Sequence, residues 1–226
     1  MKKFFVFTIL LLLLHISIYN PMGDRLIGFE FLAQGSAFDA YMQESTLVPY
    51  NIFFNTGMFV LFISRIYTKI SEIFNLSPYI MTRGGEVIFK RTLIKNSVYE
   101  IFQIIIVKSL IYALFFMIEQ RGTWFALYDV VSTFLTLSIF TFLLILCRLN
   151  GVDNKILLFV LISGNMINQI LSFEINMMSI FVIASIYWKE SPFVVLFIKI
   201  ILIWLLLCLV FFKKNVNKML EVKIND

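Results

Sequence analysis

Long apolar runs separated by short polar segments make up most of the chain. A helix needs about 20 mostly apolar residues to cross a bilayer, and six runs approach that length. The first run follows two lysines and resembles a signal peptide, but no small-residue cleavage site follows it, so an uncleaved helix is expected. We therefore predict an all-α membrane protein, a single transmembrane domain over 1–226, with spans at 4–19, 51–67, 98–118, 124–147, 156–173 and 193–212.

A further apolar stretch, residues 175–188, lies between the fifth and sixth predicted spans. It is too short to cross comfortably, since a crossing takes about 20 residues. We interpret it as a re-entrant or interfacial hairpin on the outer side of the membrane.

The composition agrees with a membrane protein. The chain is 60% hydrophobic and 15% charged, whereas soluble domains are about half apolar and about a quarter charged. The formal net charge is +5, but the basic residues lie between apolar runs and do not gather on one polar face with aromatic residues. Nucleic acid is therefore not an expected partner.

The positions of the basic residues predict the orientation. If the N-terminus, the 65–97 segment, the 148–155 turn and the C-terminal tail face the cytoplasm, they hold 14 of the 19 Lys and Arg residues. Short loops with such a bias lie on the cytoplasmic side. We expect a multi-pass protein of the cytoplasmic membrane with both termini inside. A seventh crossing at 175–188 would put the lysine-rich tail outside.

Two lysines fall within predicted spans, where a charge is costly and often functional. Lys108 lies near the middle of the third span, so it is expected to face the bundle interior, a subunit interface or an aqueous path. Both a structural pairing and a role in translocation are open for it. Lys199 lies near the outer interface, and snorkelling to the headgroups or pairing with Glu174 or Glu190 is expected.

Other polar residues extend this picture. Glu100, near the inner end of the third span, is expected to pair with Lys95 or Arg91. In the fifth span three amides, at i, i+3 and i+4, share one helix face, which indicates contact with other helices or with a translocated substrate. These residues are Asn165, Asn168 and Gln169.

The chain lacks the motifs of the common catalytic sites. It has no P-loop, no HExxH and no GxSxG, and His15 is its one histidine. A nucleotide-hydrolysing site and a histidine-dependent acid–base site are therefore excluded. We predict no catalytic residues, no metal site and no cofactor site in this chain.

The segment before the third span combines glycines, bulky apolar residues and basic residues. Gly84 and Gly85 allow a sharp backbone turn after Pro78. We expect the apolar side chains beyond the turn to lie on the membrane, with the basic ones facing anionic headgroups. The apolar set is Val87, Ile88, Leu93 and Ile94, and the basic set is Lys90, Arg91 and Lys95.

This order of parts resembles the membrane subunit of ABC-2-type exporters, which has six spans and a re-entrant element between the last two. The 77–91 segment is similar to the cytoplasmic segment of small Gram-positive permeases for bacteriocin or toxic-peptide export and immunity. The turn here reads Arg83-Gly84-Gly85 instead of an Arg-Tyr-Gly-Ser-like turn, which leaves the subfamily open. The residues that carry the resemblance are Pro78, Tyr79, Arg83, Gly84, Gly85, Glu86, Lys90 and Arg91.

The resemblance implies a function and partners. The 77–95 segment would be a coupling helix that docks on separate ABC ATPase subunits, which would bind the ATP and Mg. A second permease chain, identical or different, would complete a dimer in the membrane lipids. The substrate would be a hydrophobic or amphipathic peptide or a lipid-like compound.

Other interpretations stay open. The 77–95 segment is also compatible with a plain interfacial helix that only sets the topology. The whole chain is compatible with an accessory or immunity protein that acts by binding, or with a small secondary transporter, although no internal repeat is visible. A lipid-processing enzyme is disfavoured by the missing catalytic residues.

Overall fold

A computed structural model describes residues 47–119, 123–152, 154–174 and 192–213. These residues form helices and no strands, so the predicted all-α class is confirmed for this part of the chain. The predicted first span and the outer hairpin at 175–188 lie outside the described residues. The helices are α4 (Leu47–Asn75), α5 (Ser77–Glu119), α6 (Thr123–Leu149), α7 (Asn154–Glu174) and α8 (Pro192–Phe212).

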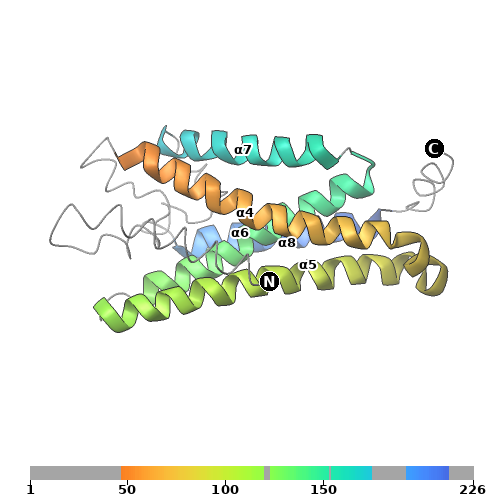
Figure 1. The fold of residues 1–226 in the computed structure, drawn as a ribbon, viewed down its shortest axis with the longest axis horizontal. Coiled ribbons are helices and arrows are strands. Elements are labelled where there is room, and N and C mark those ends of the chain that lie inside the picture. Colours follow the sequence, from red (N-terminus) through yellow and green to blue (C-terminus); the bar gives the residue numbers. More distant parts are fainter. Residues whose placement is uncertain (1–46, 120–122, 153, 175–191, 214–226) are drawn as a thin grey trace.

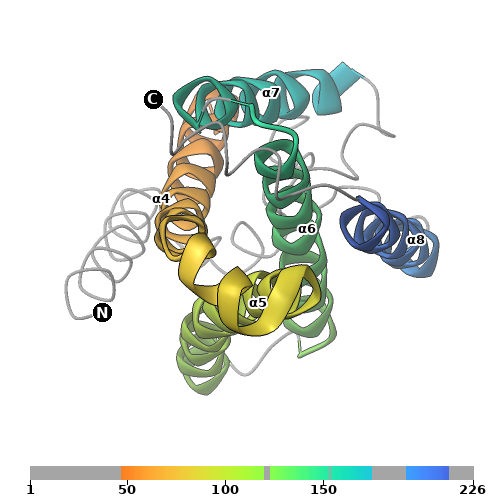
Figure 2. The same ribbon diagram turned by 90° about the vertical axis from the view of Figure 1, so that its right-hand side faces the viewer.

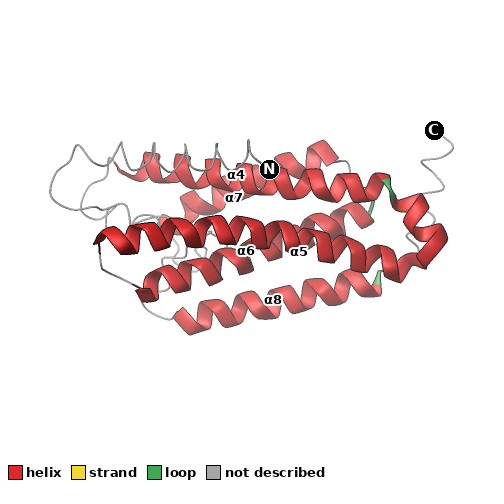
Figure 3. Cartoon of the chain, turned by 60° about the horizontal axis from the view of Figure 1, so that its bottom comes forward, coloured by secondary structure: helices red, strands yellow, loops and turns green. Residues whose placement is uncertain are grey.

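The five helices run along the long axis of the molecule and alternate in direction (Figures 1 and 3). Seen from one end, α6 lies among the others, and α8 lies at the edge of the bundle (Figure 2). Helix α6 packs against α4, α5, α7 and α8, while α4 also packs against α5 and α7. The connections from α4 to α5 and from α6 to α7 lie at the same end as the end of α8 (Figure 1).

The helix ends follow local sequence signals. Helix α8 begins at Pro192, and proline suits the first helical turn because its missing N–H has no helical partner there. Helix α6 ends before Gly151, whose φ is 79°. The Val152 N–H donates to the Cys147 carbonyl at 3.2 Å, as in a glycine-terminated helix.

Helix α5 is broken at Gly85, where φ is 72° and ψ is 177°. A left-handed φ of this kind is readily adopted only by glycine, so the predicted sharp turn is confirmed at this residue. The predicted separation of a coupling helix from the third span is wrong, because the chain after the break is helical without interruption over 86–119. We call residues 77–88, which contain the break, the elbow.

The core is built from apolar stripes at helical spacing. On α4 the buried side chains recur every three or four residues, at Phe59, Ile63, Ile66 and Ile70. The Phe59 ring meets the Phe140 ring of α6 edge-on, with centroids 4.8 Å apart. These contacts hold α4 against the central helix and position the polar groups that face α5.

Two stretches of the described helices are long and apolar enough to cross a membrane, Val130–Leu149 in α6 and Phe193–Phe212 in α8. Two such helices are weak evidence, because the core helix of a soluble protein meets the same criteria, and the α6 stretch is 67% buried. The apolar stretch of α7, Ile156–Asn168, is shorter. The described residues therefore do not support the predicted six-span topology, since only these two stretches among them meet the criteria.

Candidate functional site

The elbow lies at one end of the bundle (Figure 1), and several of its apolar side chains and Arg83 are exposed. Tyr79, Val87 and Ile88 are 55%, 57% and 49% exposed. The Arg83 guanidinium lies 4.2 Å from the centroid of the Tyr79 ring, within the range of a cation–π contact. An exposed cluster of this kind is typical of a surface that binds a partner or a membrane.

Lys90, just after the elbow, is buried, with 3% of its surface exposed. Its Nζ donates to the backbone carbonyl of Phe211 at 3.3 Å and to that of Lys213, and it forms an ion pair with Glu86 at 2.7 Å. The last carbonyls of a helix have no helical donor and carry partial negative charge, so a cation there is favourable. Lys90 therefore joins α5 to the end of α8.

The expected orientation of this segment is wrong at two positions. Lys90 does not face the headgroups, and Leu93 is fully buried and does not lie on the membrane. The reason is that 86–119 is one helix whose buried face, including Lys90, Leu93 and Ser97, points into the bundle. Arg91 and Lys95 are exposed, on other faces of the helix.

Aromatic contacts join α4, α5 and α6 near the elbow. The Phe74 ring of α4 meets the Phe89 ring of α5 edge-on at 5.4 Å. The Arg148 guanidinium of α6 lies 4.8 Å from the Phe74 ring centroid. In addition, the Lys213 Nζ donates to the Asn150 side-chain oxygen in the α6–α7 turn. Contacts at this end therefore join α4, α5, α6 and α8.

A second polar group lies along α6. Lys199 of α8 is fully buried, and its Nζ donates to Ser132 Oγ at 2.7 Å and to Thr136 Oγ1 at 2.9 Å. The predicted snorkelling of Lys199 is therefore wrong, because the two α6 hydroxyls hold its ammonium inside the bundle. Glu174 and Glu190 as additional partners remain a prediction. The i, i+4 spacing of Ser132 and Thr136 was the available sequence signal.

Lys108 faces the bundle interior, which is one of the environments predicted for it. Its Nζ donates to Thr133 Oγ1 of α6 at 2.7 Å. Ser132 and Thr133 are adjacent, so α6 places hydroxyls toward lysines from two different helices. This arrangement supplies a structural partner for Lys108, and its role in translocation remains a prediction.

The predicted amide face of α7 lies partly in the interior. Asn165 is 1% exposed, and the Asn168 Nδ2 is buried and makes no hydrogen bond in the described part of the chain. The Gln169 side chain lies outside the described residues. Helices α7 and α5 lie on opposite sides of the bundle (Figure 2), so Lys108 and the asparagines do not form a single site.

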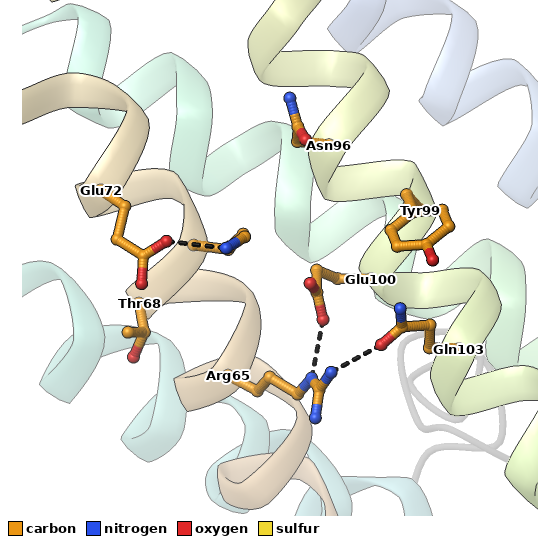
Figure 4. A pocket seen from close by; sticks show the side chains of 8 residues that line it. Arg65, Thr68, Glu72, Asn96, Tyr99, Glu100 and Gln103 are labelled. Atoms are coloured by element: carbon orange, nitrogen blue, oxygen red, sulfur yellow. Dashed lines mark hydrogen bonds and ion pairs between the residues drawn. The ribbon is translucent and has the colours of Figure 1, made fainter. Parts of the chain in front are cut away.

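A polar pocket of about 640 Å³ lies between α4 and α5. Within it, the Arg65 Nε donates to Glu100 Oε2 at 2.7 Å, and the Arg65 Nη2 donates to Gln103 Oε1 at 2.6 Å (Figure 4). The predicted pairing of Glu100 with Lys95 or Arg91 is therefore wrong. The eight residues that line the pocket are Arg65, Thr68, Lys69, Glu72, Asn96, Tyr99, Glu100 and Gln103.

Sequence reasoning missed this pocket. In the sequence, Arg65 is one of the basic residues of the 65–97 segment, and no motif around Gln103 indicates a role for it. The available signal was the i, i+3 spacing of Glu100 and Gln103, which places two acceptors on adjoining positions of one helix. Their common donor comes from a different helix, and sequence spacing does not show such a contact.

A more exposed ion pair lies at the rim of this pocket. Lys69 Nζ donates to Glu72 Oε2 at 2.8 Å, and the two side chains are 42% and 56% exposed. The hydrogen bond to Glu72 raises the pKa of Lys69 above its ordinary value of 10.5. This lysine therefore stays charged throughout the neutral range, and on the alkaline side the pair is lost as the pH rises through that raised pKa.

Comparison with protein-family models, with curated proteins and with solved structures finds no match to this chain.

Proposed function

We propose that the chain is the permease subunit of an ATP-driven exporter of the ABC-2 type, in the cytoplasmic membrane. It would have six spans and cytoplasmic termini, and it would move a hydrophobic or amphipathic peptide, or a lipid-like compound, across or out of the membrane. The elbow would contact separate ATPase subunits, and a second permease chain would complete the transport path.

The observation that carries this proposal is the combination of exposure and internal contacts at the elbow. Tyr79, Val87 and Ile88 are exposed. Lys90, only two residues further on, donates hydrogen bonds to backbone carbonyls at the end of α8 and just beyond it. A partner that pushes on the elbow would therefore act on α5 and α8 together. A plain interfacial helix does not need such a connection.

Helix length and the surface of α8 support the membrane placement. A helix of 21 residues, such as α8, is about 30 Å long, which is about the thickness of the hydrocarbon core. The other described helices are at least as long. On α8, Phe193, Phe197, Trp204 and Phe212 are 70%, 63%, 64% and 78% exposed, as suits a helix that faces lipid.

In this proposal, closure of the ATP-bound ATPase subunits displaces the elbow. The displacement passes along the rigid 86–119 helix and, through Lys90, to the end of α8. The Phe74–Phe89 contact carries it to α4. The path between two permease chains opens as these helices shift relative to α6.

Co-purification tests the proposal. A tagged full-length chain, extracted in mild detergent from its native host, should recover an ABC ATPase. The double variant Tyr79→Ala, Ile88→Ala should reduce that recovery by about tenfold, since truncation of central aromatic and aliphatic contacts costs about 1–2 kcal/mol or more.

The matched control truncates exposed apolar residues far from the elbow. The double variant Phe197→Ala, Ile201→Ala on α8 should recover as much ATPase as the unaltered chain. Failure of every preparation to recover an ATPase, or equal loss in both double variants, contradicts the proposed role of the elbow.

A further inference from the structure

The pocket between α4 and α5 has a balanced set of charges. Two of its lining residues are basic, Arg65 and Lys69, and two are acidic, Glu72 and Glu100. Two amides and two hydroxyl groups complete the lining (Figure 4). A lining with equal numbers of both charges complements a zwitterionic ligand better than an anion or a cation.

The two ion pairs of the pocket differ in accessibility. Arg65 and Glu100 are 17% and 9% exposed at their side chains, and Gln103 also holds the guanidinium. Lys69 and Glu72 are 42% and 56% exposed. An exposed pair of this kind contributes little to stability. The Lys69–Glu72 pair can therefore open, so that Lys69 binds an anionic group of a ligand and Glu72 binds a cationic one.

An apolar stripe continues from the pocket along α5. Tyr99, Ile106 and Leu110 are 61%, 55% and 55% exposed. Their spacing of seven and four residues places them on one helix face. Phe102, at the side of this stripe, is 51% exposed. Because Tyr99 also lines the pocket, the polar and apolar surfaces are continuous.

We propose that the α4–α5 pocket binds the phosphoethanolamine headgroup of a membrane phospholipid, with its acyl chains along the Tyr99–Ile106–Leu110 stripe. Lys69 donates to the phosphate, and Glu72 accepts from the primary ammonium. A volume of about 640 Å³ is within the range of small-ligand sites. This inference rests on the membrane placement in the proposed function, but it does not require transport.

The chemistry of the two ligating groups makes the headgroup selective. A primary ammonium has three N–H donors for Glu72 and its neighbours, whereas a quaternary choline ammonium has none. A glycerol headgroup supplies no positive charge to Glu72. The pocket therefore prefers phosphatidylethanolamine over phosphatidylcholine and phosphatidylglycerol.

Native mass spectrometry of the delipidated full-length chain tests this preference. Dioleoyl phosphatidylethanolamine, phosphatidylcholine and phosphatidylglycerol are titrated separately into the protein in detergent. The ethanolamine lipid should bind about tenfold more tightly than the choline lipid, the effect of about one charge-assisted hydrogen bond. Equal affinities for the three lipids overturn the proposal and indicate unselective lipid contact.

Variants at the two exposed charges locate the site. Glu72→Gln should abolish the preference for the ethanolamine lipid, and Lys69→Gln should weaken its binding about fivefold by removal of one charged donor. Lys95→Gln, an exposed lysine of α5 that does not line the pocket, is the control and should change neither quantity. A preference that persists in Glu72→Gln contradicts the assignment.

A soluble headgroup separates a lipid site from a site for a free metabolite. O-phosphoethanolamine should bind much more weakly than the lipid, and the double variant Ile106→Ser, Leu110→Ser should reduce only lipid binding. O-phosphoethanolamine that binds as tightly as the lipid overturns the role of the stripe. The control for the stripe is Phe197→Ser on α8, which should leave the lipid preference intact.

The same preparations distinguish this inference from the proposed function. Glu72→Gln should still recover the ATPase in co-purification. An unaltered chain that recovers the ATPase but shows no lipid preference contradicts only the lipid site. A chain that prefers the ethanolamine lipid but recovers no ATPase contradicts only the exporter function.

Discussion

The Nζ of Lys90 lies 3.3 Å from the backbone carbonyl oxygen of Phe211, although 121 residues separate them in the chain. This hydrogen bond brings a cation of α5 to the carbonyl end of α8, where no helical donor is available. It is the contact through which motion of the elbow would reach α8.

Lys90→Met should destabilise the chain by about 1–3 kcal/mol, since it removes a charged donor from two backbone carbonyls at the end of α8. Thermal unfolding in detergent measures this change. The exposed Lys95→Met on the same helix should change the free energy of unfolding by no more than about 0.5 kcal/mol. Equal effects of the two variants would show that Lys90 makes no special contribution.

The Arg65–Glu100 pair should behave as a coupled unit. The pair is part-buried, so removal of one partner leaves the other charge without its hydrogen bond, and Arg65→Ala and Glu100→Ala should each destabilise the chain by about 1–3 kcal/mol. The double variant should cost much less than the sum of the two. A double-mutant cycle from chemical unfolding measures the coupling, and strict additivity would contradict a direct interaction.

Substitutions at the two elbow glycines, Gly84 and Gly85, should both destabilise the chain, but for different reasons. Gly85→Ala places a side chain at φ 72° and ψ 177°, a combination that is essentially restricted to glycine and costs about 1–3 kcal/mol for other residues. At Gly84 an added Cβ would lie 2.8 Å from the Ile88 side chain.

The defect at Gly84 is steric, and Ile88→Ala removes the two nearest atoms, Cδ1 and Cγ2, but keeps Cβ at 3.0 Å. Ile88→Ala should therefore partly rescue Gly84→Ala but not Gly85→Ala. The melting temperatures of the four variants check this difference. Rescue of both glycine variants by Ile88→Ala would contradict the backbone explanation at Gly85.

The hydroxyls of α6 should matter more than their lysine partner. In the double variant Ser132→Ala, Thr136→Val, the Lys199 ammonium loses two buried acceptors, at a cost of about 0.6–2 kcal/mol each. In Lys199→Met, the Thr136 hydroxyl keeps its 2.9 Å hydrogen bond to the Ser132 backbone carbonyl. The same substitution replaces a buried charge by an apolar side chain. Lys199→Met should therefore unfold at a higher temperature than the hydroxyl double variant.

The helices themselves could be predicted wherever the chain signals both ends. The predicted 193–212 span corresponds to α8, because Pro192 starts the helix and Lys213 follows the apolar run. The fourth and fifth predicted spans likewise fall within α6 and α7. Local apolar runs, prolines and glycines are short-range signals, and they are sufficient to locate such helices.

Side-chain partners could not be predicted in this way. The orientation of Lys90 depends on where α8 ends, and the environment of Lys199 depends on hydroxyls of α6, 63 and 67 residues away. From the sequence pattern alone, a lysine near the end of a span is expected at the membrane surface. The pattern does not show that a neighbouring helix supplies a hydrogen-bond acceptor for it. The pocket between α4 and α5 was missed for the same reason.

The different environments of α6 and α8 set how freely each helix can change in evolution. Helix α6 packs against four other helices and is buried over most of its apolar stretch. Its row of hydroxyls serves two lysines, so most enlargements on its buried faces have to be matched by a neighbour. Helix α8 lies at the edge of the bundle (Figure 2), and much of its surface needs only to stay apolar. Natural variants of this protein should therefore diverge fastest along the outer face of α8 and slowest along α6.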